Sequence, residues 1–227
     1  GAALALKGKK VLEVDLDSQA SLTISTGKEP FDFEYTICDI LKKDPENVHK
    51  CIYNIYDNFD LIPSTLYLAS LELELTSRTA RETVLARALK KVDQAYDYIL
   101  IDCPPQLSIL TLNALAAADK VLIPCKPDYL SYRGLDQLEG TMADVKELIN
   151  PRLELLGVIA TLYEVVVKDQ NEILNMLKEK YNVIGITKKT AEATKGVYDG
   201  LAVVQKNPRS EISKEYMKIA EYIMEGN

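Results

Sequence analysis

Six continuous apolar runs, separated by stretches with helical periodicity, constrain the fold of this chain more than any other feature. A strand that helices cover on both faces is apolar along its whole length, whereas a strand with one wet face alternates. The runs therefore predict a doubly wound α/β fold, in which a mostly parallel sheet carries helices on both faces. They span residues 10–14, 59–62, 98–101, 120–123, 155–162 and 183–186.

Helical periodicity predicts the elements between the strands. Apolar residues recur at helical spacing within 78–92 and again near the end of the chain, so both helices should pack one side on the sheet. A long helical segment, 131–149, precedes Pro151. The recurring residues are Val84, Leu85, Ala88, Leu89 and Val92 in the first helix, and Ile212, Tyr216, Ile219, Ala220 and Ile223 in the last.

Length and organisation favour one domain over residues 1–227. A chain of 227 residues with 47% hydrophobic content can bury a sizeable core. No linker, internal repeat or low-complexity tract interrupts it. The segment 28–57 is less regular and is predicted to be a variable insertion, in which Ile37, Ile40 and Leu41 fit a short helix.

Composition narrows the class of function. No stretch approaches the roughly 18 apolar residues of a membrane helix, and no signal peptide is visible, which predicts a cytoplasmic protein. Four scattered cysteines without a C-x-x-C pair, together with a single histidine, His49, indicate a reducing compartment and argue against zinc. A net charge of −7 does not favour bulk attraction to nucleic acid, so any DNA binding must be local.

Carboxylates close two of the apolar runs. Asp102 ends the run 98–101, and Asp15 and Asp17 follow the run 10–14. In open α/β sheets the carboxyl ends of the strands form the ligand crevice, so these acids should meet at one edge. A hard cation such as Mg²⁺ prefers oxygen ligands of this kind. The alternative for Asp17 is that it and Ser18 only cap the following helix.

These acids lie in segments that resemble the ParA/MinD deviant P-loop ATPases, and specifically their ParA or Soj partition branch. The stretch from Val14 to Thr23 is similar to the family pattern Asp-x-Asp-Pro-Gln-x-x-x-Thr. The segment from Tyr98 to Pro105 is similar to the motif that ends in Ile-Asp-Cys-Pro-Pro. The order of the other motifs also agrees: Leu61-Ile62-Pro63-Ser64, Asn113 to Asp119, Leu122-Ile123-Pro124 and Gly134 to Leu138.

The resemblance implies an ATPase of plasmid or chromosome partitioning that uses ATP and Mg²⁺. It makes Asp102 the Mg²⁺-associated aspartate, acting through water, Asp17 the residue that positions the attacking water, and Asp15 a support for the metal and phosphate region. Asp15, Asp17, Asp102 and Pro104 would all lie at the nucleotide, Pro104 in a loop that senses the terminal phosphate.

The same resemblance implies partners and a location. It suggests an ATP-dependent homodimer, a centromere-binding partner protein and nonspecific DNA, with no membrane association, in a cytoplasmic and nucleoid-associated protein. Lys206, Arg209 and Lys214 are the candidate DNA-binding residues. A basic residue often occupies the position of Glu211 in the branch, and the competing interpretation of this region is a solvated helix start.

The sequence departs from the family at the phosphates. Its glycine-rich, lysine-bearing phosphate loop and first central strand are not among these residues. Gly8-Lys9-Lys10 lacks the following Ser or Thr, and we interpret Gly8 as a helix C-terminal glycine. The residues as printed are therefore expected to hydrolyse ATP negligibly. Ser18 replaces the usual Pro, and Glu13 places a charge in a strand expected to be buried.

Three alternatives remain open at this point. The chain could be a non-hydrolysing regulatory or protein-binding module that keeps the fold. A relative of the metal-cluster ATPases would need cysteines that share a cluster between subunits, and Cys103 and Cys125 sit beside strand ends. A membrane role of the MinD kind would need an extra amphipathic, basic C-terminal helix, whereas the last helix here is expected to face the core.

Overall fold

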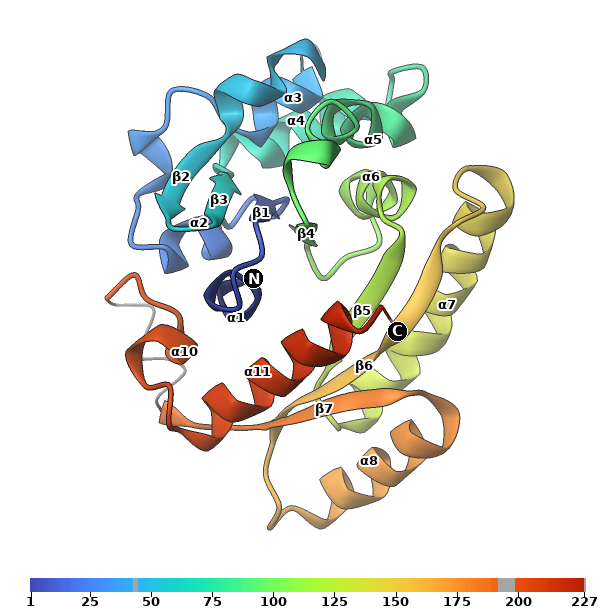
Figure 1. Cartoon of the computed structure of the whole chain (residues 1–227). Coiled ribbons are helices and arrows are strands. Elements are labelled where there is room, and N and C mark those ends of the chain that lie inside the picture. Colours follow the sequence, from blue (N-terminus) through green and yellow to red (C-terminus); the bar gives the residue numbers. More distant parts are fainter. Residues whose placement is uncertain (43–44, 192–198, 227) are drawn as a thin grey trace. The chain divides into compact units, whose positions relative to one another are not determined.

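The computed structural model of the chain describes residues 1–42, 45–191 and 199–226, and Figure 1 shows their elements. Two compact units emerge, one of residues 1–118 with 196–202 and one of residues 119–195 with 203–227. Each unit is built on a mostly or wholly parallel sheet flanked by helices, which confirms the predicted α/β class. The prediction that residues 1–227 form one domain stays a prediction, and each unit is described by itself.

The first unit is built on a four-stranded sheet in the order β2-β3-β1-β4. Strand β1 lies in the middle and runs parallel to both β3 and β4, while β2 is antiparallel to β3. Its helices and strands are α1 (Ala2–Leu6), β1 (Val11–Asp15), α2 (Ser21–Ser25), α3 (Ile37–Lys42), β2 (Tyr53–Tyr56), β3 (Phe59–Ile62), α4 (Tyr67–Leu75), α5 (Val84–Leu89), β4 (Tyr98–Asp102) and α6 (Ile109–Ala117).

Alternation along β1 separates the two faces of this sheet. Leu12 and Val14 join the core that α3, α4, α5 and α6 cover. Glu13, between them, points to the other face of the sheet and is partly buried.

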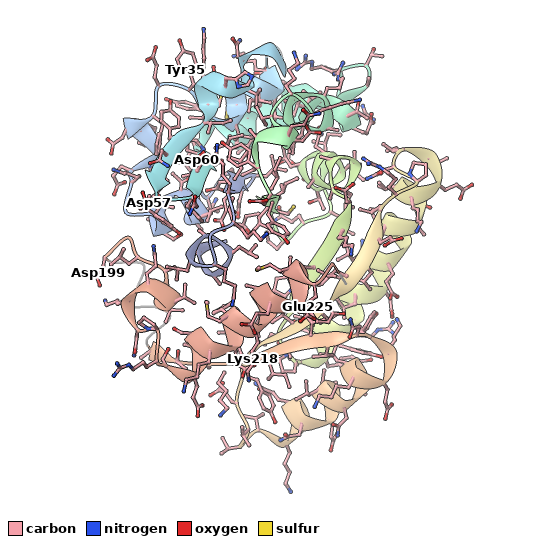
Figure 2. The ribbon with its side chains drawn as sticks, in the orientation of Figure 1. Tyr35, Asp57, Asp60, Asp199, Lys218 and Glu225 are labelled. Carbon is pink, nitrogen blue, oxygen red and sulfur yellow. The ribbon has the colours of Figure 1, made fainter. Side chains whose placement is uncertain are left out.

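Strand β2 was not predicted, although its signal is visible afterwards. Asp57 and Asn58 form a tight turn between β2 and β3, and Asn58 has the positive φ of 62° that such turns require. Asp60 of β3, labelled in Figure 2, accepts hydrogen bonds from Asn54 at 2.8 Å and from the Tyr96 hydroxyl at 2.7 Å. These bonds tie the hairpin to the segment that leads into β4.

The predicted insertion 28–57 contributes to the core of the first unit. Ile37, Ile40 and Leu41 form the expected short helix, α3, and are fully buried. Val48 and Cys51, from the 3₁₀ segment that follows, are buried with them. The variability of this segment stays a prediction.

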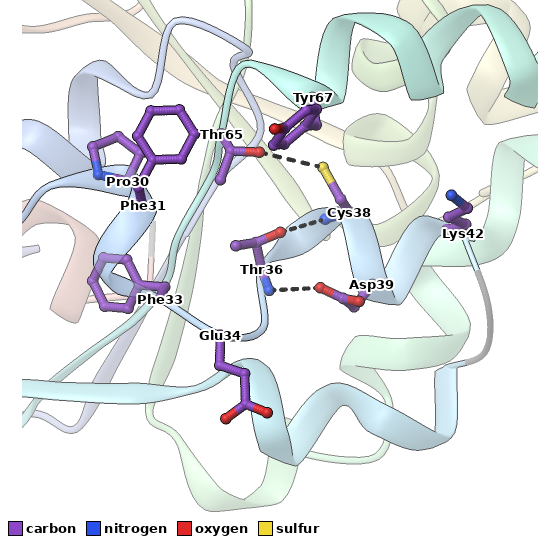
Figure 3. A pocket seen from close by; sticks show the side chains of 10 residues that line it. All are labelled: Pro30, Phe31, Phe33, Glu34, Thr36, Cys38, Asp39, Lys42, Thr65 and Tyr67. Carbon is purple, nitrogen blue, oxygen red and sulfur yellow. Dashed lines mark hydrogen bonds between the residues drawn. The ribbon is translucent and has the colours of Figure 1, made fainter.

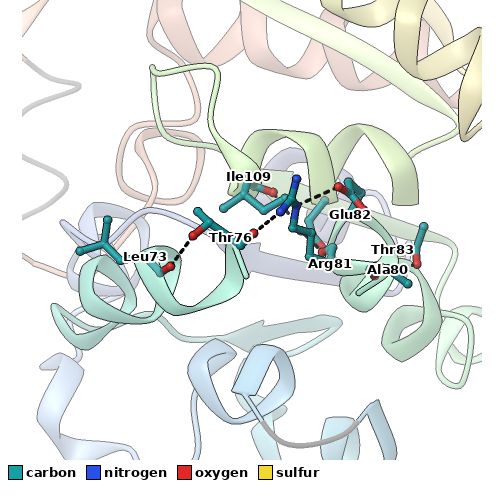
Figure 4. Close-up of polar contacts among 8 residues, drawn as sticks. Leu73, Thr76, Ala80, Arg81, Glu82, Thr83 and Ile109 are labelled. Atoms are coloured by element: carbon teal, nitrogen blue, oxygen red, sulfur yellow. Dashed lines mark hydrogen bonds and ion pairs between the residues drawn. The ribbon is translucent and has the colours of Figure 1, made fainter. Parts of the chain in front are cut away.

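The predicted helix over 78–92 is shorter than expected. Its apolar residues are buried as predicted, but Ala80 has a φ of 53°, and α5 covers only Val84–Leu89. Figure 4 shows Arg81 donating to the Thr76 carbonyl and pairing with Glu82 at 3.0 Å. These contacts form a separate turn between the end of α4 and the start of α5, so the helix begins at Val84 and not near residue 78.

The second unit is a three-stranded parallel sheet in the order β5-β6-β7. Figure 1 shows α7 and α11 on opposite sides of these strands. Val158 joins the core under α7 and α8, whereas Ile159, next along β6, lies on the face of Gly185 and Ile219. The unit contains β5 (Lys120–Cys125), α7 (Tyr129–Leu148), β6 (Glu154–Tyr163), α8 (Lys168–Lys180), β7 (Val183–Lys188), α10 (Val203–Lys206) and α11 (Glu211–Met224).

The last helix faces the core, as predicted. Ile212, Ile219 and Ala220 of α11 are buried, and Gly185 of β7 has no side chain, which lets Ile219 approach the strand closely. Within the described residues, no helix has both the length and the apolar character needed to cross a bilayer.

Candidate functional site

The predicted acids meet at the carboxyl edge of the first unit's sheet. Asp15 and Asp102 are register partners at the ends of the parallel strands β1 and β4. Just beyond them, the Leu16 amide donates to the Asp102 carbonyl at 2.9 Å. Because parallel strands end at the same edge, two residues 87 positions apart become neighbours.

Asp15 is fully buried and its carboxylate is engaged by the loop that follows it. Its Oδ2 accepts from the amide of Thr23 at 2.8 Å and from the Thr23 hydroxyl at 2.7 Å, and its Oδ1 accepts from the Asp17 amide at 3.2 Å. Burial raises the pKa of Asp15, and the hydrogen bonds from Thr23 and Asp17 oppose that rise. Asp15 therefore holds the loop in place from inside the protein.

Thr23 extends this network to a third strand end. Its hydroxyl donates to Asp15 and accepts from the amide of Ser64, at 3.0 Å, just after β3. Both residues lie within motifs that resemble the family, but no role was predicted for either of them from the sequence. Their pairing spans 41 residues, and only the β1–β3 register brings them together.

Asp17 lies partly exposed on the loop after β1. Its Oδ1 accepts from the Gln19 amide at 3.0 Å, and its carbonyl accepts from the Ala20 amide at 3.0 Å, so the loop forms an Asx turn. Helix α2 starts after Ala20, which makes no side-chain cap. The alternative that Asp17 and Ser18 cap this helix is wrong, because Asp15 accepts from its Thr23 amide instead.

Asp102 lies at the end of β4 and is electrostatically disfavoured as an anion. Loss of hydration, followed by the negative charges of Asp15, Glu13 and Asp17, raises the pKa of Asp102 to about 6. A cation placed at this carboxylate would relieve that repulsion. The edge that carries Asp15, Asp17 and Asp102 thus has the negative charge and the carboxylate oxygens that a hard divalent ion prefers.

The donor set fits a magnesium ion that keeps much of its water. Across the described ranges, no three His, Cys, Asp or Glu side chains are arranged to hold a metal on their own. Mg²⁺ commonly takes one or two carboxylates and fills its remaining positions with water and phosphate oxygens. Asp102 lies at the end of β4, and Pro104 follows it on the adjoining loop.

The cysteines beside the strand ends are protonated thiols. Burial, and then the charge of Asp102, raises the pKa of Cys103 to about 12, while burial raises the pKa of Cys125 to about 11. Metal clusters are bound by thiolates. These environments give no support to the cluster alternative.

Gly8 ends a helix, as interpreted from the sequence. It has a φ of 80°, and the amides of Gly8 and Lys9 donate to the carbonyls of Ala5 and Leu4, which closes α1 in a Schellman motif. The Gly8-Lys9-Lys10 segment is therefore a helix end that leads into β1.

The candidate DNA-binding residues flank the start of α11 in the second unit. Lys206, Arg209 and Lys214 are all exposed. Glu211, in the first turn of α11, pairs with Lys188 at the end of β7, at 3.1 Å. Glu211 thus offsets the charge of a fourth basic residue, Lys188, which would otherwise add to the positive charge of this surface.

Known proteins resemble this chain over most of its length. A family model described as an AAA domain matches residues 1–155. The sporulation initiation inhibitor protein Soj of Bacillus subtilis is 36% identical over 229 residues, which cover 98% of this chain and 89% of that protein.

Solved structures also resemble this chain over nearly its whole length. A putative plasmid partition protein from Borrelia burgdorferi, bound to AMPPNP, is 26% identical with a TM-score of 0.80, covering 100% of this chain and 92% of that one. The cobyrinic acid a,c-diamide synthase of Mycobacterium smegmatis, with a bound ATP analogue and magnesium, is 32% identical with a TM-score of 0.83, covering 99% and 85%.

Proposed function

Because this chain belongs to the ParA/Soj family of partition ATPases, we propose that it binds ATP with Mg²⁺ and hydrolyses ATP during plasmid or chromosome partitioning. Relatives of this fold bind ATP analogues, and one does so with magnesium. The observation that carries the proposal is the adjacency of Asp15 and Asp102 at the carboxyl ends of neighbouring parallel strands, with Asp17 on the following loop.

Each acid has a separate task in this proposal. Asp102 holds the hydrated Mg²⁺, which when bound neutralises charge on the phosphates. Asp17 orients the water for in-line attack, because the turn to Gln19 fixes its carboxylate on the loop. Asp15 supports the metal and phosphate region from inside the protein, because its buried hydrogen bonds hold the loop that carries Asp17.

The phosphates need a cradle of backbone amides as well as these acids. Gly8-Lys9-Lys10 closes α1 and does not provide one. This segment is therefore not part of the proposed phosphate site.

The proposal extends to assembly and DNA. An ATP-dependent homodimer in the cytoplasm would bind nonspecific DNA through Lys206, Arg209 and Lys214 and would respond to a centromere-binding partner protein. Exposed basic side chains of this kind contact phosphates without reading bases. Family membership supports the homodimer, the partner and the location. The exposure of the three basic side chains supports DNA binding.

Turnover of ATP by Asp17→Ala tests the assignment. We expect a loss of about 100-fold in turnover, with nucleotide binding retained, because a positioning group for water acts mainly on the chemical step. Asp57→Ala, at the exposed tip of the β2–β3 turn (Figure 2), removes the same charge and should hydrolyse ATP like the unmodified protein.

Unchanged turnover in Asp17→Ala would remove Asp17 from the mechanism. If the unmodified protein also failed to hydrolyse ATP with DNA and partner present, the chain would be a non-hydrolysing module of the same fold.

A further inference from the structure

A second concave site opens on the first unit, formed by residues that the proposed nucleotide site does not use. Figure 3 shows this pocket, which has a volume of about 280 Å³. It lies between the 3₁₀ turn Pro30–Asp32, helix α3 and the start of α4. This volume lies just below the usual range of small-molecule sites and suits a single large side chain.

Two aromatic rings form an exposed rim on the pocket. Phe31 is 69% exposed and Tyr67 is 70% exposed, although both are large apolar side chains. They come from separate elements and meet edge to face, with their ring centroids 6.4 Å apart. Exposed aromatic residues beside a hollow are typical of binding surfaces, since covering them removes apolar area from water.

The lining of the pocket is negatively charged. The lining residues include two acidic ones, Glu34 and Asp39, and one basic one, Lys42. Asp39 is fixed at the start of α3, where its Oδ2 accepts from the Thr36 amide at 3.0 Å. An anion such as a phosphate would be repelled here, whereas one cationic group would be attracted.

The floor of the pocket is polar but neutral. The Cys38 thiol lies 3.8 Å from the Thr65 hydroxyl, and burial raises the pKa of Cys38, so the thiol stays protonated. The described part of the chain offers no three-residue metal cluster, here or elsewhere. A bare metal ion is therefore a poor match for this pocket.

We propose that the pocket receives an arginine side chain from a basic segment of a partner protein. A guanidinium group stacks on aromatic faces and pairs with carboxylates. The pocket offers the rings of Phe31 and Tyr67 and has acidic residues, Glu34 and Asp39, in its lining. The aliphatic stem of the arginine would cover the exposed rings.

The apolar surface next to the rim favours a peptide as the ligand rather than a free small cation. Leu66, which precedes Tyr67, is 60% exposed. A peptide in which apolar residues flank an arginine would cover the aromatic rim and Leu66 together. The net charge of −7 on this chain also favours a basic partner.

Titration of the ¹⁵N-labelled chain with the peptide acetyl-Leu-Arg-Leu-amide, followed by NMR, tests this proposal. We expect saturable shifts of the Thr36, Cys38 and Thr65 amides. The same peptide with citrulline, which keeps the shape and loses the charge, should bind about 10-fold more weakly, because charged hydrogen bonds are lost.

Variants locate the site. Phe31→Ala, Tyr67→Ala and Glu34→Gln should each weaken binding about 5-fold, and the exposure of both rings means that the chain should still fold. Leu73→Ala, which removes an exposed side chain of α4 outside the pocket, should leave the affinity unchanged.

Several outcomes would overturn the proposal: equal binding of the citrulline peptide, unchanged affinity in the three pocket variants, or the absence of saturable shifts at the named amides. The same shifts produced by tripolyphosphate would also overturn it, because they would show an anion site. None of these results depends on nucleotide binding or hydrolysis.

Discussion

The two sheets of this molecule share an architecture and differ at their strand ends. In the first unit, β1 and β4 end in Asp15 and Asp102, whereas in the second β5, β6 and β7 end in Cys125, Tyr163 and Lys188. The candidate chemistry therefore belongs to the first unit and the candidate DNA surface to the second. In a parallel sheet all strands end at the same edge, and the side chains at that edge determine which chemistry can take place there.

The two units also differ in how their key polar groups are held. Asp15 is buried and bonded to Thr23, which in turn accepts from Ser64. Glu211 and Lys188 in the second unit form an exposed pair. Buried networks are costly to break and exposed pairs contribute little, so substitutions in the two units should differ in scale.

The largest effect is expected for Thr23→Val, which keeps the shape and removes the hydroxyl. Both the buried Asp15 carboxylate and the Ser64 amide would lose a partner, which should lower the free energy of unfolding by about 2–4 kcal/mol. Urea unfolding measures this. Thr23→Ser keeps the hydroxyl and should lose less than about 1 kcal/mol; similar losses for both variants would contradict the network.

Gly200→Ala should have the next largest effect. Gly200 has a φ of 64°, and an added Cβ would lie 2.6 Å from the Cα of Gly27, itself at a φ of 76°. Left-handed strain together with a backbone clash should cost about 2–3 kcal/mol. Gly8→Ala is the control, because Gly8 has a φ of 80° and open space around it.

Thermal unfolding separates the two contributions to the Gly200→Ala effect. Gly8→Ala should lose only the roughly 1 kcal/mol of conformational strain. An equal loss in both variants would show that the contact between residues 27 and 200 does not matter for stability.

Asp102→Asn should stabilise the protein at neutral pH. Because the pKa of Asp102 is raised to about 6, the folded state disfavours the anion, and stability falls as pH rises from about 4 to about 6. The amide removes that penalty, by on the order of 1 kcal/mol after solvent screening, or about 2–4 °C at pH 7.

Melting curves at pH 4 and pH 7 check this prediction. At pH 4 the variant and the unmodified chain should differ little, since Asp102 is then largely protonated. A destabilised variant at pH 7 would show that the repulsion from Asp15, Glu13 and Asp17 is not significant.

The smallest effect on stability is expected for Glu211→Lys. The exposed pair with Lys188 contributes at most about 0.5 kcal/mol, but the substitution frees Lys188 and reverses a charge beside Arg209 and Lys214. Affinity for duplex DNA at low salt should rise several-fold, with a steeper salt dependence.

Glu172→Lys is the matched control for that experiment. It changes the net charge by the same amount at an exposed position of α8. If both variants raised DNA affinity equally, net charge alone would explain the effect and the surface around α11 would not be the binding site.

The sequence by itself determined the class of fold and the identity of the acids. All six predicted strands are present, because a strand covered on both faces must be apolar along its length. Asp15, Asp17 and Asp102 stood out because each follows such a run. Gly8 was also assigned correctly, since a glycine after a short apolar helix has a local reason to be there.

Only the tertiary structure decided what the acids do locally. That Asp15 is buried, that it accepts from Thr23, and that Thr23 accepts from Ser64 depend on the register between strands far apart in the chain. The same holds for the break before α5, where the side chain of Asn113 accepts from the Leu85 amide. Periodicity records which side chains are apolar, but hydrogen bonds between distant segments leave no period in the sequence.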